Sequence, residues 1–193
     1  MEPLILKLPS SKQFTDDELF EFCAANKELR IERDKKGQII IMPPTGALSG
    51  NQNFTVNTLF GQWVLANKNL GYGFDSSTGF CLPNGAMRSP DAAWIKKEQW
   101  EQLSSDEQEK FAPLTPDFII EVRSESDSLN ELQDKMWEWM DNGCRLAWLI
   151  DPPEQKAYVY TPEGSMQTIN SFDEKLSGGD VLPGFELDLL VLK

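Results

Sequence analysis

The chain contains no histidine, and this absence removes several classes of mechanism. Neither a Ser-His-Asp nor a Cys-His catalytic arrangement can be built, and no zinc or iron site can use imidazole ligands. Any bound metal must therefore be held by oxygen atoms. Oxygen ligands favour hard cations such as Mg²⁺, Mn²⁺ or Ca²⁺.

Cysteine and long apolar runs are also scarce. The cysteines Cys23, Cys81 and Cys144 are far apart and form no CxxC pair, so their spacing predicts neither a zinc site nor a disulfide framework. No apolar stretch approaches the roughly 20 residues that cross a bilayer. The first seven residues lack the basic and apolar regions of a signal peptide. We therefore expect no membrane association and a cytoplasmic location.

Basic residues are outnumbered, with 18 Lys and Arg against 31 Asp and Glu and a net charge of -13. Such a chain repels nucleic acid at long range unless its basic groups cluster or a bound metal reverses the local potential. The charge therefore counts against a nuclease without excluding one. Solubility is the ordinary explanation of the excess acid.

The length of 193 residues fits a single domain, residues 1–193, with a sizeable core. A hydrophobic content of 40% and six tryptophans indicate a folded globule. Thr15 and Glu18 form a capping box that predicts a helix ending near Asn26. Further along we expect a hairpin over 29–42, a long helix over 48–67 and a second hairpin over 72–82.

The second half of the chain alternates strands and helices. We expect strands at 90–95 and 116–123 with a short surface helix over 100–110 between them. Ser128 and Glu131 then open a helix over 128–142. The apolar run 145–150 suits a central strand, and 157–160 and 185–189 supply further strands. This order predicts an α/β fold with a mixed central sheet.

The most informative pattern is an acid on each of two buried strands, followed by a lysine on the next helix. Asp91 begins one strand, Glu121 lies near the end of the next, and Lys135 lies on the helix. Two carboxylates at one point repel each other unless a cation or a proton lies between them. A divalent metal there activates water and polarises a phosphoryl group, and a lysine neutralises developing charge.

These residues carry a resemblance to a known family. Glu32, Pro90-Asp91, Glu121-Val122-Arg123-Ser124, Lys135 and the segment 148–152 follow one another in the order seen in the Uma family of endonucleases. That family belongs to the restriction-endonuclease-like superfamily with the PD-(D/E)XK signature. The segments 41–46 and 134–136 add to the resemblance, which covers residues from about Thr15 to Tyr160.

The resemblance implies a mixed sheet flanked by helices, with the acids at one sheet edge. It also implies Mg²⁺- or Mn²⁺-dependent cleavage of DNA or another phosphodiester. Asp91 and Glu121 would bind the metal, and the backbone carbonyl of Val122 would complete its shell. Glu32 would lie nearby, as a supporting carboxylate or as a ligand of a second metal.

The chain departs from the superfamily signature at its lysine. The signature position after Glu121 is occupied by Arg123, which is always charged and cannot act as a general base, although it can hold a phosphate. The resemblance implies that the signature lysine is replaced by Lys135, on the helix that follows. Because Leu132 and Trp139 lie on the buried side of the same helix, the ammonium group of Lys135 can reach Glu121.

Each of these residues also has an ordinary structural interpretation. Asp91 follows a proline, where aspartate commonly starts a turn or strand. Lys135 lies four residues after Glu131, the favoured spacing of a surface ion pair. Glu32 alternates with apolar neighbours and could be solvated. Asp117 shares the Pro-Asp pattern, but it lies too far along its strand from Glu121 to join one small site.

Three functions follow from these interpretations. The first is a metal-dependent endonuclease acting on DNA. The second is a catalytically inactive homodimeric interaction protein of the same fold, favoured by the acidic charge, by Arg123 at the signature position, and by an aromatic helix that looks exposed. Trp137 and Trp139 of this helix are more typical of core or dimer packing than of base stacking. The third is a hydrolase of a small phosphoester, which would need a narrow closed pocket over Glu121. The homodimer is expected only by analogy at the level of the fold.

Overall fold

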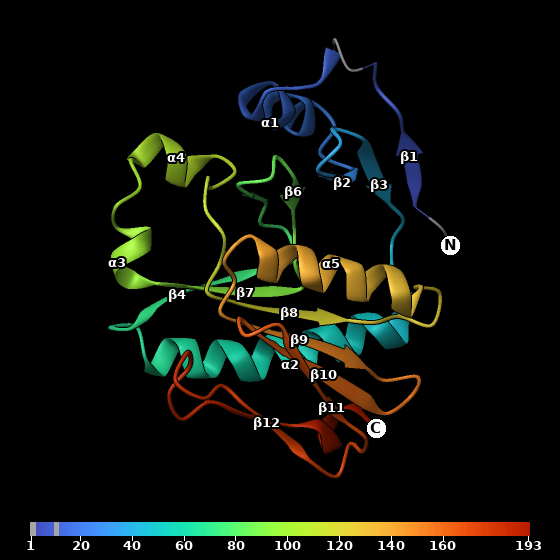
Figure 1. The fold of residues 1–193 in the computed structure, drawn as a ribbon, viewed down its shortest axis with the longest axis vertical. Coiled ribbons are helices and arrows are strands. Elements are labelled where there is room, and N and C mark those ends of the chain that lie inside the picture. Colours follow the sequence, from blue (N-terminus) through green and yellow to red (C-terminus); the bar gives the residue numbers. More distant parts are fainter. Residues whose placement is uncertain (1–2, 10–11) are drawn as a thin grey trace.

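A mixed six-stranded sheet forms the centre of the computed structural model, which describes residues 3–9 and 12–193 (Figure 1). Only β8 and β9 run parallel, and the other neighbouring strands run antiparallel. In spatial order the strands are β11 (Ser165–Ile169), β10 (Lys156–Thr161), β9 (Leu146–Asp151), β8 (Phe118–Val122), β7 (Ala92–Lys96) and β4 (Gly71–Asp75).

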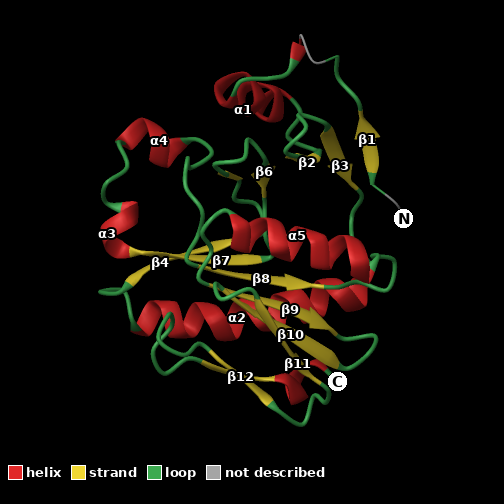
Figure 2. Cartoon of the chain, viewed as in Figure 1, coloured by secondary structure: helices red, strands yellow, loops and turns green. Residues whose placement is uncertain are grey.

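Helices cover both faces of this sheet (Figure 2). Side chains of a strand alternate between faces, so Phe118 and Ile120 pack with α2 (Ala47–Ala66), while Ile119 packs with α5 (Leu129–Asp141). The α2 layer also includes β12 (Lys175–Ser177), β13 (Glu186–Asp188) and the 3₁₀ helix η2 (Leu189–Leu192). The predicted α/β fold with a mixed central sheet flanked by helices is therefore confirmed.

A second, smaller sheet lies above α5 in Figure 1. Its strands, in spatial order, are β1 (Leu4–Leu6), β3 (Ile39–Met42), β2 (Arg30–Arg33), β6 (Met87–Arg88) and β5 (Phe80–Cys81). The predicted capping box of Thr15 and Glu18 opens α1 (Asp16–Ala25), which packs on one face of this sheet. Ile31 and Arg33 face α1, so Glu32 points the other way, toward α5.

The prediction of a hairpin over residues 72–82 is wrong. β4 pairs with β7 in the central sheet, whereas β5 pairs with β6 in the small sheet. The turn between β4 and β5 therefore carries the chain from one sheet to the other. Local alternation identifies extended segments but does not specify their distant partners. The helical segment expected over 100–110 forms two short helices, α3 (Lys97–Trp100) and α4 (Ser105–Glu109).

Among the described residues, no helix has the length and apolar character needed to cross a membrane. The three cysteines, Cys23, Cys81 and Cys144, are all free thiols. Trp139 is fully buried on the sheet side of α5, which confirms its predicted position on the buried side of the helix. Trp137 packs edge-on against Tyr160, with ring centroids 5.0 Å apart.

Two glycines, one closely packed and one in open space, test the packing of β4 against β7. A Cβ atom at Gly71 would lie 2.2 Å from the carbonyl oxygen of Ile95, whereas one at Gly61 in α2 would meet nothing within 4 Å. We expect Gly71→Ala to lower the free energy of unfolding by about 1–3 kcal/mol. Gly61→Ala should raise it by about 0.5–1 kcal/mol, because alanine favours a helix. Denaturant titration of both variants checks the pair, and equal effects would contradict this packing.

Candidate active site

Asp91 and Glu121 meet where β7 and β8 run side by side. Ala92 is paired with Ile120 in the antiparallel ladder, so Asp91, one residue before β7, lies opposite Glu121. The carboxylate of Asp91 accepts a hydrogen bond from the backbone N–H of Val122 at 2.8 Å. Both acids are buried. The two carboxylates predicted from the sequence are therefore brought together at one end of the sheet.

Helix α2 holds the other oxygen of Asp91. The side-chain amide of Asn53 donates to Oδ1 at 2.7 Å, and the amide of Asn57 donates to the backbone carbonyl of Asp91 at 3.1 Å. Arg30 reaches the same Oδ1 from β2, with a nitrogen–oxygen distance of 3.7 Å. Asp91 is thus oriented from three directions rather than left as a simple strand start.

Lys135 bridges the central sheet and the small sheet. Its ammonium group lies 2.8 Å from Oε1 of Glu121 and 2.9 Å from Oε1 of Glu32. A surface pair with Glu131, the ordinary interpretation of this lysine, is not among its ion pairs to described residues. Because α5 packs between the two sheets, its lysine can contact an acid from each of them.

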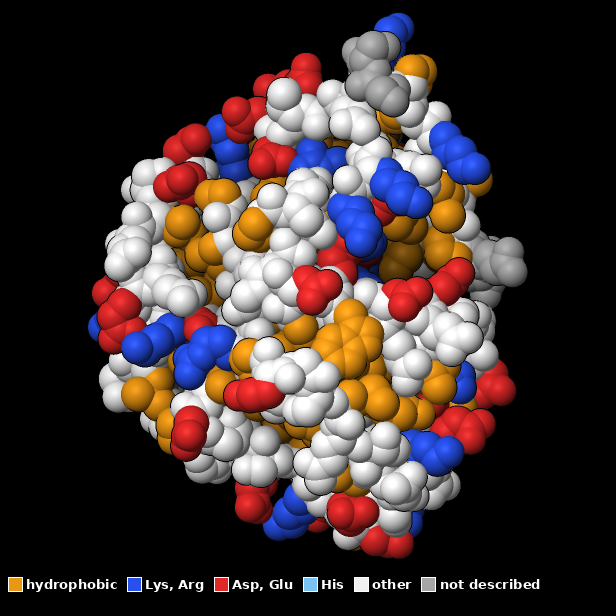
Figure 3. Space-filling model, in the orientation of Figure 1, with side chains coloured by type: hydrophobic (Ala, Val, Ile, Leu, Met, Phe, Trp, Pro, Cys, Tyr) orange, Lys and Arg blue, Asp and Glu red, His pale blue; other side chains and the backbone are white. Residues whose placement is uncertain are grey.

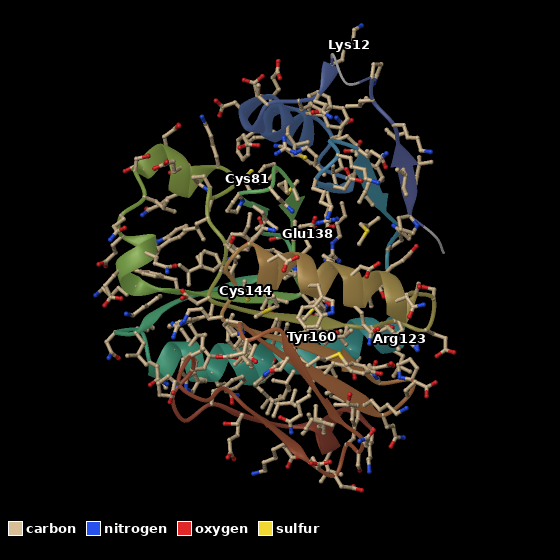
Figure 4. The ribbon with its side chains drawn as sticks, viewed as in Figure 1. Lys12, Cys81, Arg123, Glu138, Cys144 and Tyr160 are labelled. Carbon is tan, nitrogen blue, oxygen red and sulfur yellow. The ribbon has the colours of Figure 1, made fainter. Side chains whose placement is uncertain are left out.

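Glu32 is buried rather than solvated, and it is held on all sides. Besides Lys135, it accepts hydrogen bonds from Arg88 at 3.0 Å and from the backbone N–H of Ser89 at 3.1 Å. Arg88 in turn contacts Glu138 of α5 at 2.6 Å. Figure 4 shows Glu138 on the side of α5 that faces the small sheet. This network fixes Glu32, and through it the position of Lys135.

The two glutamates beside Lys135 have opposite pKa shifts. Burial raises the pKa of Glu121 to about 7, the nearby carboxylates of Asp91 and Glu32 act in the same direction, and Lys135 opposes the shift without cancelling it. Burial would also raise the pKa of Glu32, but Lys135 and Arg88 outweigh it and lower that pKa to about 2. Glu32 is therefore always ionised, whereas Glu121 holds a proton in weakly acidic solution.

Lys135 stays positively charged at neutral pH. Burial alone would lower its pKa, but the carboxylates of Glu121 and Glu32 outweigh burial and raise it above its ordinary value. A lysine with a raised pKa is a poor general base. It is well suited to holding a fixed positive charge beside a developing negative one.

The residues at Glu121 fit a hard divalent cation. Oε1 of Glu121 is buried and has no aligned hydrogen-bond donor, although Lys135 lies within ion-pair distance. No group of three or more acid, cysteine or histidine side chains stands ready for a metal in the described part of the chain. Mg²⁺ is commonly bound by one or two carboxylates and several waters, so Asp91, Glu121 and the carbonyl of Val122 are a sufficient set.

The other charged residues considered from the sequence have separate partners. Arg123 at the signature position lies 3.0 Å from Asp151 of β9, which is fully buried. Asp117 is at the opposite end of β8 from Glu121. It accepts a hydrogen bond from the backbone of Lys96 at 2.8 Å and pairs with Arg145 at 3.4 Å. Neither Arg123 nor Asp117 contacts the carboxylates of the site.

The sequence did not single out four residues that support the site: Asn53, Arg88, Glu138 and Arg30. In the sequence, Arg88 was marked only as a charged residue three positions before Asp91, next to a strand predicted to be buried. Asn53 and Asn57, four residues apart, had no signal beyond sharing one side of a predicted helix.

Two cavities lie away from these residues. One of about 450 Å³ lies between α1 and the turn after β2, and one of about 340 Å³ lies at the start of α2 beside Arg123. Neither cavity is lined by Asp91, Glu121 or Lys135. They therefore do not supply the closed pocket over Glu121 that a small phosphoester would need.

The raised pKa of Glu121 makes a prediction for the metal-free protein. The folded state holds this proton up to about pH 7, whereas the unfolded chain releases it near pH 4.5, so folding stability falls as pH rises between these values. Glu121→Gln keeps the shape without the charge. We compare the free energy of unfolding of this variant with that of the native chain. We expect the difference, variant minus native, to be larger at pH 8 than at pH 5 by on the order of 3 kcal/mol. Denaturant titrations at both pH values measure this difference, and an equal effect at pH 5 and pH 8 would contradict it.

Comparison with known proteins identifies the family of the chain. The model of the Uma2 family, described as "Putative restriction endonuclease", matches residues 16–190. The fold is similar to a crystal structure of "a putative nuclease belonging to DUF820" from Anabaena variabilis ATCC 29413, with a TM-score of 0.73 and 20% identity over 93% of this chain and 97% of that chain. Comparison with curated proteins gives no match. The family match spans most of the chain and every residue of the site, and the chain belongs to the Uma2 family of restriction-endonuclease-like proteins.

Proposed function

We propose that this protein is a Mg²⁺- or Mn²⁺-dependent endonuclease that hydrolyses phosphodiester bonds in DNA. The observation that carries the proposal is the meeting of Asp91, Glu121 and Lys135 at one end of the central sheet, where burial raises the pKa of Glu121 to about 7 in spite of Lys135. A divalent cation is the natural counter-charge for such a carboxylate. Membership of the Uma2 family supports the same reaction class.

Asp91, Glu121 and the backbone carbonyl of Val122 would hold the cation. When bound, it would polarise a phosphoryl oxygen and lower the pKa of a water molecule. Asn53 and the N–H of Val122 keep the Asp91 carboxylate in one orientation, so little reorganisation is needed on binding.

Lys135 supplies positive charge at the point where the phosphate would gain negative charge. Its raised pKa favours this role over proton abstraction. Glu32 positions the lysine and is ionised at every working pH, since its pKa is about 2. Arg88 satisfies the second oxygen of Glu32, which leaves Glu32 less available as a ligand for a second metal.

A catalytically inactive interaction protein is the alternative within the same fold. Its supporting observation is the surface of α2, which carries no charged residue and exposes Leu48, Phe54 and Leu65. Two copies of an acidic chain could meet through such a face. The homodimer stays a prediction for light scattering to decide, and the cytoplasmic location also stays a prediction.

Two Pro-Asp pairs in the chain give a matched activity test. Asp91 and Asp117 both follow a proline and are both buried, but only Asp91 belongs to the site. We expect Asp91→Asn and Glu121→Gln to lower Mg²⁺-dependent cleavage of a DNA duplex by about 100-fold or more, as expected for loss of charge that stabilises a transition state. Asp117→Asn should cut at close to the native rate.

Lys135→Gln tests the fixed positive charge in the same assay. We expect a loss of similar size that does not recover at high pH, since a cation rather than a base is removed. Folding of every variant is verified by denaturant titration. Native cleavage rates in both Asp91→Asn and Glu121→Gln would refute the proposed site.

A further inference from the structure

Lysines that pair with no described acid are concentrated at one end of the molecule. Beyond residue 42, every Lys and Arg except Lys68 lies within 4.0 Å of a described carboxylate. Before it, no ion pair to a described residue is formed by Lys7, Lys12, Lys27, Lys35 or Lys36. In a chain with a net charge of -13, such a distribution leaves one region able to attract an anion.

Four of these lysines, which we call the lysine patch, gather around the small sheet: Lys7, Lys12, Lys35 and Lys36. All four are exposed. Lys35 and Lys36 form the turn between β2 and β3, and Lys7 follows β1, whose last residue pairs with the first of β3. Gln13 donates to the backbone carbonyl of Lys36 at 2.7 Å, which brings the loop of Lys12 to the same turn. Figure 4 shows Lys12 at the outer tip of this unit, and Figure 3 shows Lys and Arg side chains gathered over it.

The acids near this patch are engaged elsewhere. The carboxylate of Asp34 accepts hydrogen bonds from the backbone N–H groups of Lys36 and Gln38, at 2.9 and 2.8 Å. On α1, Asp16 pairs with the buried Arg33 and Asp17 pairs with Lys110. None of these three acids forms an ion pair with a lysine of the patch.

Strand β2 connects the lysine patch to the candidate active site. The patch lies at the turn that follows β2, while Arg30 at the start of β2 is partly exposed and reaches to 3.7 Å from Asp91. Between them, Glu32 contacts Lys135. Five residues of extended chain span about 17 Å. The β2 residues between these two positions are buried, so β2 fixes the distance between the two positive sites and is not itself a surface that DNA follows.

We propose that the lysine patch, at the exposed end of the small sheet, is the surface on which this protein docks the phosphate backbone of DNA. The lysine patch holds phosphates away from the cut, and Arg30 holds one beside Asp91. Lysine contacts to phosphate carry no base information, so this binding is independent of sequence. The inference rests on the proposed nuclease function. It explains how an acidic chain can approach a polyanion.

The test compares two variants that lose the same number of charges. The patch variant replaces Lys7, Lys12, Lys35 and Lys36 by Gln, and the control variant replaces Lys68, Lys156, Lys175 and Lys193 by Gln. Both are made in the full chain with Glu121→Gln, which prevents cleavage from obscuring binding. Affinity for a labelled DNA duplex is measured by fluorescence anisotropy over a series of salt concentrations.

We expect the patch variant to bind at least about 10-fold more weakly at low salt, with a salt-dependence slope smaller by about 0.9 for each phosphate that the variant no longer neutralises. The control variant should keep the slope of the parent protein. Equal weakening in both variants, unchanged binding by the patch variant, or no binding by the parent would each overturn the docking surface.

Cleavage by the native chain in Mg²⁺ separates this inference from the proposed function. Cleavage that persists when the patch lysines are replaced, with unchanged binding, would remove the docking surface and leave the nuclease standing. Patch-dependent binding by a chain that never cuts DNA would keep the docking surface and remove the nuclease.

Discussion

The arrangement of this molecule depends on the two ion pairs that the ammonium group of Lys135 forms. This group lies between Glu121 of the central sheet and Glu32 of the small sheet, and it comes from the helix that separates them. Arg88 of β6 makes a second connection between the small sheet and α5, because it contacts both Glu32 and Glu138. A buried ion pair is costly to form but far more costly to break, because removing one partner leaves an uncompensated charge. The relative placement of the two sheets and the chemistry of the site are thus set by the same contacts.

Within this network, Glu121 is the buried acid whose pKa is raised. Glu32 contacts both Arg88 and Lys135, whereas Glu138 contacts Arg88. The hydrogen bonds to Asp91 come from neutral groups, and Arg30 lies 3.7 Å from it. Burial is the main cause of the raised pKa of Glu121, about 7, and Lys135, which Glu121 shares with Glu32, does not cancel it. A proton or a metal ion bound to Glu121 relieves the cost of its buried charge. We regard the burial of Glu121, together with the nearby carboxylate of Asp91, as the reason why the site is suited to bind a cation although Lys135 lies within ion-pair distance.

Much of the fold could be predicted because its signals are local. Thr15 and Ser128 begin helices through hydrogen bonds to residues three positions ahead, and both helices form as expected. The hairpin over 72–82 could not be assigned correctly, since its two strands pair with different sheets. Asp91 and Glu121 could be selected from the sequence because each lies near an end of an apolar strand. The roles of Asn53 and Arg88 could not be predicted, because α2 and β6 reach the site from distant parts of the sequence.

The most direct test is calorimetric titration of Mn²⁺ into the native chain and into Asp91→Asn near pH 6.5, each with and without a DNA duplex. Two buffers with different heats of ionisation reveal any proton released. The native chain should bind Mn²⁺ and release a proton from Glu121, because a metal ligand must be deprotonated. Asp91→Asn should bind weakly or not at all. Equal binding by both chains, or no binding by the native chain even with DNA present, would contradict a metal site between Asp91 and Glu121.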